Sequence, residues 1–105
     1  MKFRFNNSVA VHVPDLRKAE AFYSGVLGFR LLAKNDDLLE YETGRAQFQV
    51  RKAAVVRPPA PSFTVIDARA AKSRLEENGC EIVEDRGRSL SFKDPFGFVY
   101  ELTED

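Results

Sequence analysis

Two Asp residues and two Gly residues recur at nearly the same spacing in the two halves of the chain. Asp15 and Asp67 lie 52 positions apart, and Gly28 and Gly79 lie 51 positions apart. Asp is favoured at the N-cap of a helix and Gly just beyond its C-terminal end, so the four residues mark where two helices begin and end. Matching starts and stops predict one supersecondary unit that is repeated.

Each predicted helix is preceded by one strand and followed by three. Val9, Val11 and Val13 alternate with small or polar residues, which is the pattern of a strand with two different faces. Short runs bounded by turn residues supply the other strands. In order, the predicted elements are strand 3–13, helix 16–27, strands 29–33, 38–43 and 46–52, then strand 63–66, a helix from 68 to 77, and strands 80–84, 89–93 and 98–103. Residues 94–97 suit a type I turn.

These elements predict an α+β fold of two βαβββ modules. Each module alone would leave one sheet face without a helix, so we expect the pair to form a curved, partly closed mixed sheet with the helices outside. A chain of 105 residues fits a single domain, 1–105, with module one at 1–57 and module two at 62–105. Residues 57–61 contain three prolines, and we expect them to form a stiff linker that cannot continue a central strand.

Composition excludes several classes of function. Sixteen basic and sixteen acidic side chains cancel, which argues against general affinity for nucleic acid or anionic lipid. Apolar runs are too short for a membrane span, and the first residues lack the apolar stretch of a secretory signal, so we expect a cytoplasmic protein. Cys80 is the only cysteine, so no intrachain disulfide can form.

Charge is divided unevenly along the chain. Up to Arg57 there are ten Lys plus Arg against six Asp plus Glu, and from Pro58 onward there are six against ten. Two explanations stay open: the basic and acidic halves meet across an interface, within a chain or between two chains, or the surface charge is scattered by chance.

Alternation places several polar side chains on the face opposite the valines. His12 shares a strand face with Ser8, and Gln47 and Gln49 alternate with apolar neighbours. A histidine there can hydrogen-bond a ligand or carry a proton near neutral pH. The structural alternatives are a histidine satisfied by local backbone and a solvated edge strand carrying the two glutamines.

Glu101 is the candidate carboxylate of the second half. Alternation with Tyr100 and Leu102 points it away from the helix, and an inward carboxylate is costly unless paired. It could bind a ligand, act as a general base, or complete an ion pair with an arginine. Phe92 and Phe98 could line an aromatic wall for a planar ligand, with core or turn packing as the alternative.

Three stretches carry a family pattern. Val11-His12-Val13-Pro14-Asp15-Leu16, then Ala21-Phe22-Tyr23 and Val26-Leu27-Gly28-Phe29, together with Asp94-Pro95-Phe96-Gly97-Phe98-Val99-Tyr100-Glu101-Leu102, resemble the vicinal-oxygen-chelate superfamily of glyoxalases, bleomycin-resistance proteins and extradiol dioxygenases. The resemblance spans nearly the whole chain. It implies paired βαβββ modules, a cavity inside the sheet, and usually a homodimer.

The resemblance also implies where a divalent metal would be held. The two positions that usually supply ligands from the first strand of each module correspond to Ser8 and, near the start of module two, Ala60. Gln49 and Glu101 match the remaining positions. With His12 as the only histidine, we expect no cofactor and no two-histidine site within one chain. A hard-metal site of oxygen ligands, using Glu101, Gln49 and waters, is the alternative.

Three functions follow from these expectations. The first is metal-independent binding, with sequestration as one form, of a small and partly apolar organic molecule by Ser8, His12, Gln47, Gln49, Phe92, Phe98 and Glu101. The second is a glyoxalase-like lyase, isomerase or dioxygenase, with His12 and Glu101 as the catalytic residues. The third is a dimeric interaction module without a small-molecule site. The identity of the ligand is beyond the sequence.

Overall fold

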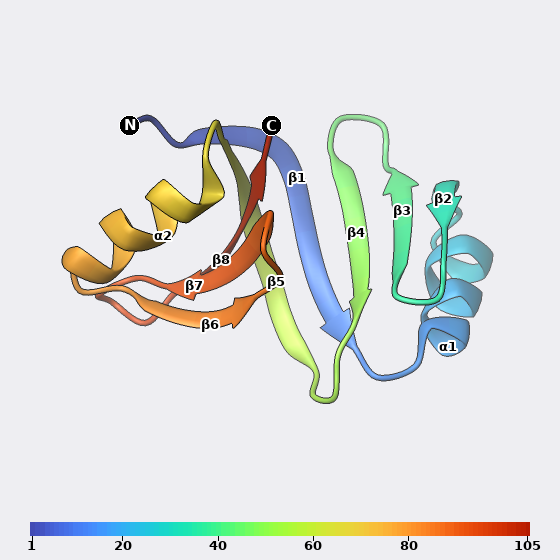
Figure 1. Ribbon diagram of the computed structural model, residues 1–105. Coiled ribbons are helices and arrows are strands. Elements are labelled where there is room, and N and C mark those ends of the chain that lie inside the picture. The colour runs from blue at the N-terminus through green and yellow to red at the C-terminus, as the bar shows by residue number, and fades with distance from the viewer. The chain divides into compact units, whose positions relative to one another are not determined.

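The computed structural model describes all residues from Met1 to Asp105, and the order β-α-β-β-β occurs twice (Figure 1). The elements are β1 (Arg4–Val13), α1 (Leu16–Glu20), η1 (Ala21–Val26), β2 (Arg30–Lys34), β3 (Leu38–Glu42), β4 (Gln47–Lys52), β5 (Arg57–Val65), α2 (Ala68–Glu77), β6 (Glu81–Asp85), β7 (Ser89–Lys93) and β8 (Val99–Glu104). The predicted α+β class with two βαβββ modules is confirmed. No helix has the length and apolar character needed to cross a bilayer.

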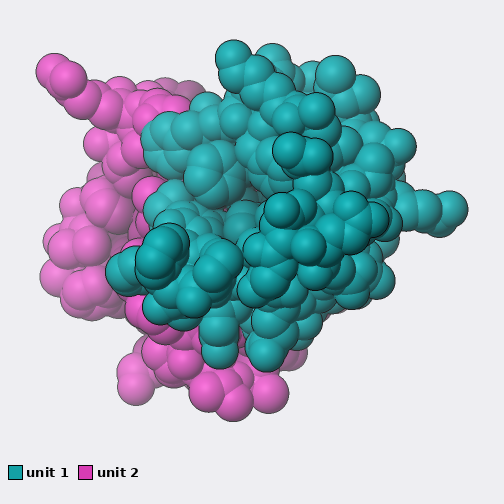
Figure 2. All heavy atoms as spheres, turned by 90° about the vertical axis from the view of Figure 1, so that its left-hand side faces the viewer, with its two compact units in different colours: residues 1–6, 60–105 teal, residues 7–59 magenta.

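The chain divides into two compact units, coloured separately in Figure 2. Unit 1 contains residues 1–6 and 60–105, and unit 2 contains residues 7–59. The first six residues therefore group with the second half of the sequence, whereas the sequence predicted that they belong to module one. Their contacts explain the grouping, because Phe3 packs against the core of unit 1 and the Phe5 ring meets the Phe63 ring at 6.2 Å.

Unit 2 holds a mixed four-stranded sheet in the order β2-β3-β4-β1. β1 and β4 are parallel, and the other neighbours are antiparallel. One sheet face packs against α1 through a buried cluster formed by Val11, Ala19, Leu39, Tyr41 and Val50. Val13 packs on the same cluster, so these two β1 valines face the helix.

The first helix differs from its prediction in one respect. Asp15 caps it as expected by accepting from the backbone N–H groups of Arg17 and Lys18, and Gly28 with φ +74° follows its end. The predicted single α-helix, however, ends at Glu20 and continues as the π-helix η1, with the Leu27 N–H donating to the Phe22 carbonyl at 3.0 Å. The wider turn accompanies dense aromatic packing of Tyr23, whose ring lies 4.9 Å from that of Phe48.

Unit 1 repeats the arrangement with the order β5-β8-β7-β6, in which β5 and β8 are parallel. α2 follows the predicted cap Asp67, and its C-cap Asn78 is followed by Gly79 with φ +85°. Its buried face packs on a core made of Val65, Ala68, Ala71, Leu90, Phe92 and Leu102.

The proline-rich segment contains the boundary between the two units, but it is part of a strand, which the sequence analysis did not expect. Strand β5 begins at Arg57 and runs through the three prolines to Val65. Its pairing with β8 starts only at Ser62, so the prolines lie outside that hydrogen-bonded ladder and their missing N–H groups cost nothing there. Their fixed φ angles also suit an extended backbone.

The strand registers show how closely the two units correspond. In unit 2 Ala10 pairs with Gln49, and in unit 1 Ser62 pairs with Glu101. Both members of the second pair lie 52 positions after those of the first, which is the spacing of the two helix caps. Gln49 and Glu101 therefore occupy equivalent places in the repeated unit.

Candidate functional site

Glu101 lies on the face of the unit 1 sheet that is turned away from α2. Its strand neighbours there are Ser62 on β5 and Ser91 on β7. Glu101, Ser62 and Ser91 are all buried. Glu101 Oε1 accepts a hydrogen bond from Arg86 Nη2 at 2.7 Å, and Oε2 accepts one from the Ser91 hydroxyl. Each carboxylate oxygen is thus engaged by a donor from within unit 1.

Arg86 is held on several sides. Its Nε donates to Ser89 Oγ at 2.8 Å, and its Nη1 donates to Ser91 Oγ at 3.3 Å and lies 3.1 Å from Glu84 Oε2. Together with the contact to Glu101, these interactions fix both the plane and the direction of the guanidinium.

The backbone of Arg86 is fixed by the turn between β6 and β7. The Arg86 N–H donates to the Ser89 carbonyl at 2.9 Å, and Gly87 adopts φ +88°, which favours glycine. The Gly87 N–H also donates to the Asp85 carboxylate. This bond and the nearby Lys72 ammonium lower the pKa of Asp85. The turn and its charged flank therefore present Arg86 in one position.

An N-terminal segment adds to the same unit. Asn6 Nδ2 donates to Ser62 Oγ at 3.0 Å and to Thr64 Oγ1 at 3.1 Å. Its Oδ1 atom is buried without a hydrogen-bond partner. A buried unpaired acceptor costs free energy, so this oxygen is a place where a ligand or water donor would be stabilised.

Unit 2 has the equivalent polar face. Ser8, Ala10 and His12 of β1 pair with Gln47, Gln49 and Arg51 of β4, which puts these residues on the face opposite the valines. Ser8 and His12 are buried, Gln49 is half-buried and Gln47 is exposed. The Ser8 hydroxyl has no hydrogen-bond partner although only 4% of the residue is exposed. Like Asn6 Oδ1, the Ser8 hydroxyl is a buried polar group that a hydrogen bond from or to a ligand or water would stabilise.

The two predicted phenylalanines do not lie beside Glu101. Phe92 belongs to the core on the helix side of the sheet, where its ring lies 5.4 Å from that of Tyr100. Phe98 follows the predicted turn, in which the Gly97 N–H donates to the Asp94 carbonyl, and it is 64% exposed. The alternative of core or turn packing describes both positions.

The residues that do surround Glu101 were missed at the sequence level. Ser62, Ser91 and Arg86 were not selected, although Ser89 and Ser91 alternate with Leu90 and Phe92 in the printed sequence. That alternation would have placed the serines on the face of Glu101. Nothing in the local sequence around Arg86 distinguishes it from other arginines in turns.

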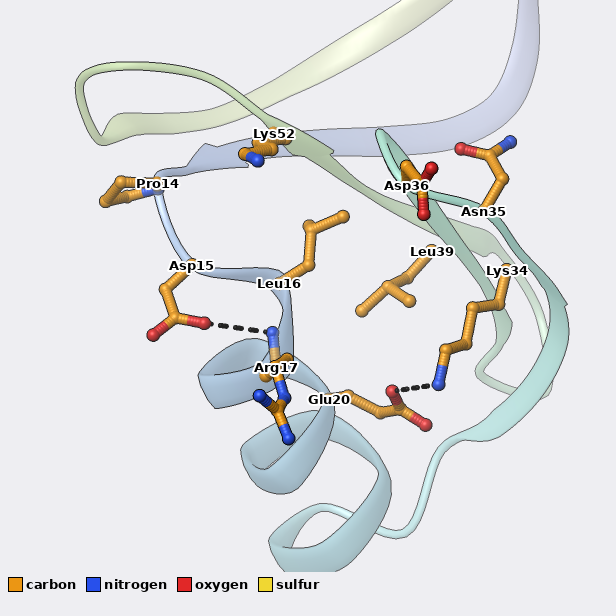
Figure 3. A pocket seen from close by; sticks show the side chains of 10 residues that line it. All are labelled: Pro14, Asp15, Leu16, Arg17, Glu20, Lys34, Asn35, Asp36, Leu39 and Lys52. Carbon is orange, nitrogen blue, oxygen red and sulfur yellow. Dashed lines mark hydrogen bonds and ion pairs between the residues drawn. The ribbon is translucent and has the colours of Figure 1, made fainter.

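A hollow of about 420 Å³ lies in unit 2 between the start of α1 and the turn between β2 and β3 (Figure 3). Leu16 and Leu39 point into its centre, and the Lys34–Glu20 ion pair, at 2.9 Å, closes one end. Three basic and three acidic side chains line it, so it has no net preference for either charge. None of the candidate site residues predicted from the sequence lines it, although the helix cap Asp15 does.

Comparison with known proteins identifies the family whose sequence pattern this chain carries. The family model of the Glyoxalase/Bleomycin resistance protein/Dioxygenase superfamily matches residues 6–102. No curated protein sequence matches the chain.

Solved structures match the whole chain. An extradiol ring-cleaving dioxygenase from B. fuscum superposes with a TM-score of 0.66 and 23% identity, over 99% of this chain and 33% of the dioxygenase. Homoprotocatechuate 2,3-dioxygenase from Brevibacterium fuscum, in complex with 3,4-dihydroxyphenylacetate, superposes with a TM-score of 0.65 and 24% identity. The match covers 99% of this chain and 37% of that dioxygenase. The hypothetical protein BH1468 from Bacillus halodurans C-125 superposes with a TM-score of 0.67 and 15% identity. The match covers 100% of this chain and 96% of that protein. The chain thus spans about a third of the length of these dioxygenases, and the likeness concerns the fold.

Proposed function

The chain belongs to the Glyoxalase/Bleomycin resistance protein/Dioxygenase superfamily, and we propose that it is a metal-independent member that binds a small organic molecule. Binding rests on the buried, unpaired Ser8 Oγ and Asn6 Oδ1 atoms, and independence of metal rests on the ion pair of Glu101 with an arginine, which the sequence analysis gave as an alternative. Both carboxylate oxygens of Glu101 accept hydrogen bonds from donors of unit 1, one of them a guanidinium.

The donor set does not fit a divalent metal. Of the positions that match the family's metal ligands, Ser8 and Gln49 offer neutral oxygens, Ala60 offers no donor atom, and Glu101 has the Arg86 cation 2.7 Å away. No group of three or more His, Cys, Asp or Glu side chains is arranged to hold a metal ion. A divalent cation next to a fixed guanidinium would also be repelled. We therefore assign no step to a metal.

Binding is supported by polar groups that are buried and incompletely satisfied. Ser8 Oγ and Asn6 Oδ1 are buried without partners in the folded chain. Ligand pockets are typically formed by a few placed polar groups among apolar ones, and unsatisfied polar atoms favour such a site over plain core packing. In this proposal the candidate binding residues of unit 2 are Ser8, His12, Gln47 and Gln49, and those of unit 1 are Glu101 and Phe98, with Phe92 in the core of that unit. Sequestration of the ligand is one form of this function.

The proposal is tested with metal-stripped protein and three probes: 3,4-dihydroxyphenylacetate, catechol and phenylacetate. The first probe is chosen because a matching dioxygenase structure contains it. We expect isothermal titration calorimetry to show saturable binding of at least one probe, unchanged by EDTA. Glu101→Gln, which keeps size and removes charge, should weaken it.

Native mass spectrometry of untagged protein provides the control. We propose that the protein is a cytoplasmic homodimer free of metal. One spectrum gives the number of subunits and the mass of anything bound. Stoichiometric divalent metal on the purified protein would contradict the proposal, as would the failure of all three probes to bind.

A further inference from the structure

We propose that the guanidinium of Arg86 is the anchor for an oxygen atom of the ligand. This inference rests on the proposed function and specifies the chemistry of the same site. It follows from the number of donors on Arg86, from their fixed direction, and from the exposure of the group.

One donor of Arg86 has no acceptor. An arginine side chain carries five N–H groups. Nε donates its single N–H to Ser89, Nη1 donates to Ser91 and forms an ion pair with Glu84, and Nη2 donates one N–H to Glu101. A second N–H on Nη2 is left, directly beside the carboxylate at the family's ligand position.

The guanidinium that carries this donor is fixed in direction and partly exposed. The Arg86 side chain is 21% exposed, whereas that of Glu101 is 4% exposed, so the guanidinium is the open end of the cluster. Its direction is already set by four partners, so a ligand would lose little free energy in ordering it. A fixed donor on a cation suits an oxygen acceptor, which is the shared chemistry of a carboxylate, a phenol and a carbonyl.

The test compares Arg86→Lys with the unaltered protein, using the same three probes. Lysine keeps the positive charge, but its single ammonium group cannot make the four contacts of the Arg86 guanidinium and also donate to a ligand. We expect the dissociation constant of a bound probe to rise about 10-fold or more. Catechol binding would identify hydroxyl oxygens as the anchored group, and phenylacetate binding would identify the carboxylate.

Two further variants separate a ligand contact from a structural effect. Arg88→Lys changes the neighbouring arginine of the same turn, which is 80% exposed and pairs with Glu104, and should leave probe binding unchanged. Ser89→Ala removes only the Nε partner and should weaken binding less than Arg86→Lys. Equal probe binding by Arg86→Lys and the unaltered protein would overturn the anchor while leaving the proposed function intact. Failure of every probe to bind the unaltered protein would overturn both.

A second observation, independent of the site, concerns ion pairs at equivalent positions of the two units. In unit 2 Glu20 on α1 pairs with Lys34 at the end of β2, at 2.9 Å. In unit 1 Lys72 on α2 pairs with Asp85 at the end of β6, at 3.0 Å. The pairs correspond in the repeat, but their charges are reversed.

The outer hairpins show the same reversal. Arg30 on β2 lies opposite Glu42 on β3, with an ion pair of 3.5 Å. Glu81 on β6 lies opposite Lys93 on β7, with an ion pair of 4.0 Å.

The charges are also reversed at a third set of equivalent positions, at the end of each sheet near the helix. In unit 1 the Glu104 N–H donates to the Arg88 carbonyl at 2.8 Å, and the two side chains pair at 2.9 Å. In unit 2 the Lys52 N–H donates to the Asp37 carbonyl at 2.9 Å. The backbone geometry is equivalent and each charge is opposite.

We infer that this reversed polarity keeps the two halves of a duplicated chain from exchanging helices and strands during folding. α1 on the sheet of unit 1 would put Glu20 against Asp85, and α2 on the sheet of unit 2 would put Lys72 against Lys34. Each such like-charge contact disfavours the wrong arrangement by about twofold, and an exchange creates several of them together.

The inference is tested by giving both units the same polarity. The variant Glu20→Lys, Lys34→Glu, Arg30→Glu, Glu42→Arg keeps every native ion pair of unit 2 and the net charge. We expect the molecules of this variant that do fold to melt at the same temperature as the unaltered protein. The yield of native protein on refolding, however, should fall severalfold. Yield is measured by size-exclusion chromatography and by amide signals in NMR spectra.

The decisive control also reverses the four corresponding residues of unit 1. This eight-residue variant has opposite polarity in the two units again and should recover the refolding yield. An unchanged yield in the four-residue variant, or no recovery in the eight-residue variant, would overturn the inference.

Discussion

Removal of Arg86 tests the reasoning about the Glu101 cluster through stability alone. Arg86→Met keeps most of the side-chain length but removes the guanidinium that lies 2.7 Å from the Glu101 carboxylate, whose side chain is 4% exposed. Breaking one side of a buried ion pair costs about 3–5 kcal/mol. Because the Arg86 side chain is 21% exposed, water reaches part of the pair, and we reduce the expected loss to about 2–3 kcal/mol.

The loss is measured by urea unfolding at neutral pH, followed by circular dichroism. The matched control is Arg88→Met, whose ion pair with Glu104 is largely exposed on the arginine side and should be worth less than about 1 kcal/mol. The double variant Arg86→Met with Glu101→Leu removes both charges and should recover much of the stability. If Arg86→Met unfolds within about 0.5 kcal/mol of the unaltered protein, the cluster does not stabilise unit 1 as argued.

Three further changes test other parts of the molecule. Leu90→Ala opens a cavity in the fully buried core of unit 1 and should cost about 2–5 kcal/mol in urea unfolding. Tyr41→Phe removes the hydroxyl that bonds Ser24 of η1 at 2.9 Å and should cost about 1 kcal/mol, with faster amide exchange in η1. Hydrogen bonds from the Ala68 N–H and from Arg88 lower the pKa of Glu104 from its ordinary 4.5. The stability that Glu104 contributes is therefore present above that value and is lost as pH falls through the folded pKa. Glu104→Gln should reduce the acid sensitivity of unfolding between about pH 5 and 3.

The sequence predicted most of the fold because the decisive signals are local. Asp15 and Asp67 act as caps through their own side chains, and Gly28 and Gly79 adopt the positive φ angles that end their helices. The π-helix was not predictable in this way. Its wider turn depends on how Tyr23 packs against strands that come later in the chain.

The error over the proline-rich segment has a different cause. Proline was taken to exclude a central strand, but its cost depends on whether a neighbouring strand needs the missing N–H. The register that begins at Ser62 removes that need on the β8 side, and a register is a tertiary property. The same applies to residues 1–6, whose grouping with unit 1 rests on contacts with residues far along the chain, such as that of Arg4 with Asp105.

The candidate site was predictable only where one strand determined it. Alternation along β8 identified Glu101 and its face. Arg86 was missed because its position depends on the β6–β7 turn and on the irregular register between Ile82 and Glu84. Phe92 was left open between a site wall and core packing because aromatic content alone does not say which face of β7 it occupies. Its strand neighbours Ser91 and Lys93 carry that information.

The equivalence of Gln49 and Glu101 explains why the charged cluster occurs in one unit only. In unit 2 the neighbours of Gln49 are Ala10 on one side and Glu40 on the other. A carboxylate in place of Gln49 would oppose the like charge of Glu40, with no hydroxyl on Ala10 to offset it. In unit 1 the same two positions are serines, and one of them donates to Glu101. The replacement of an amide by a carboxylate thus depends on its neighbours, and the ligand chemistry proposed here follows from that difference between the two copies.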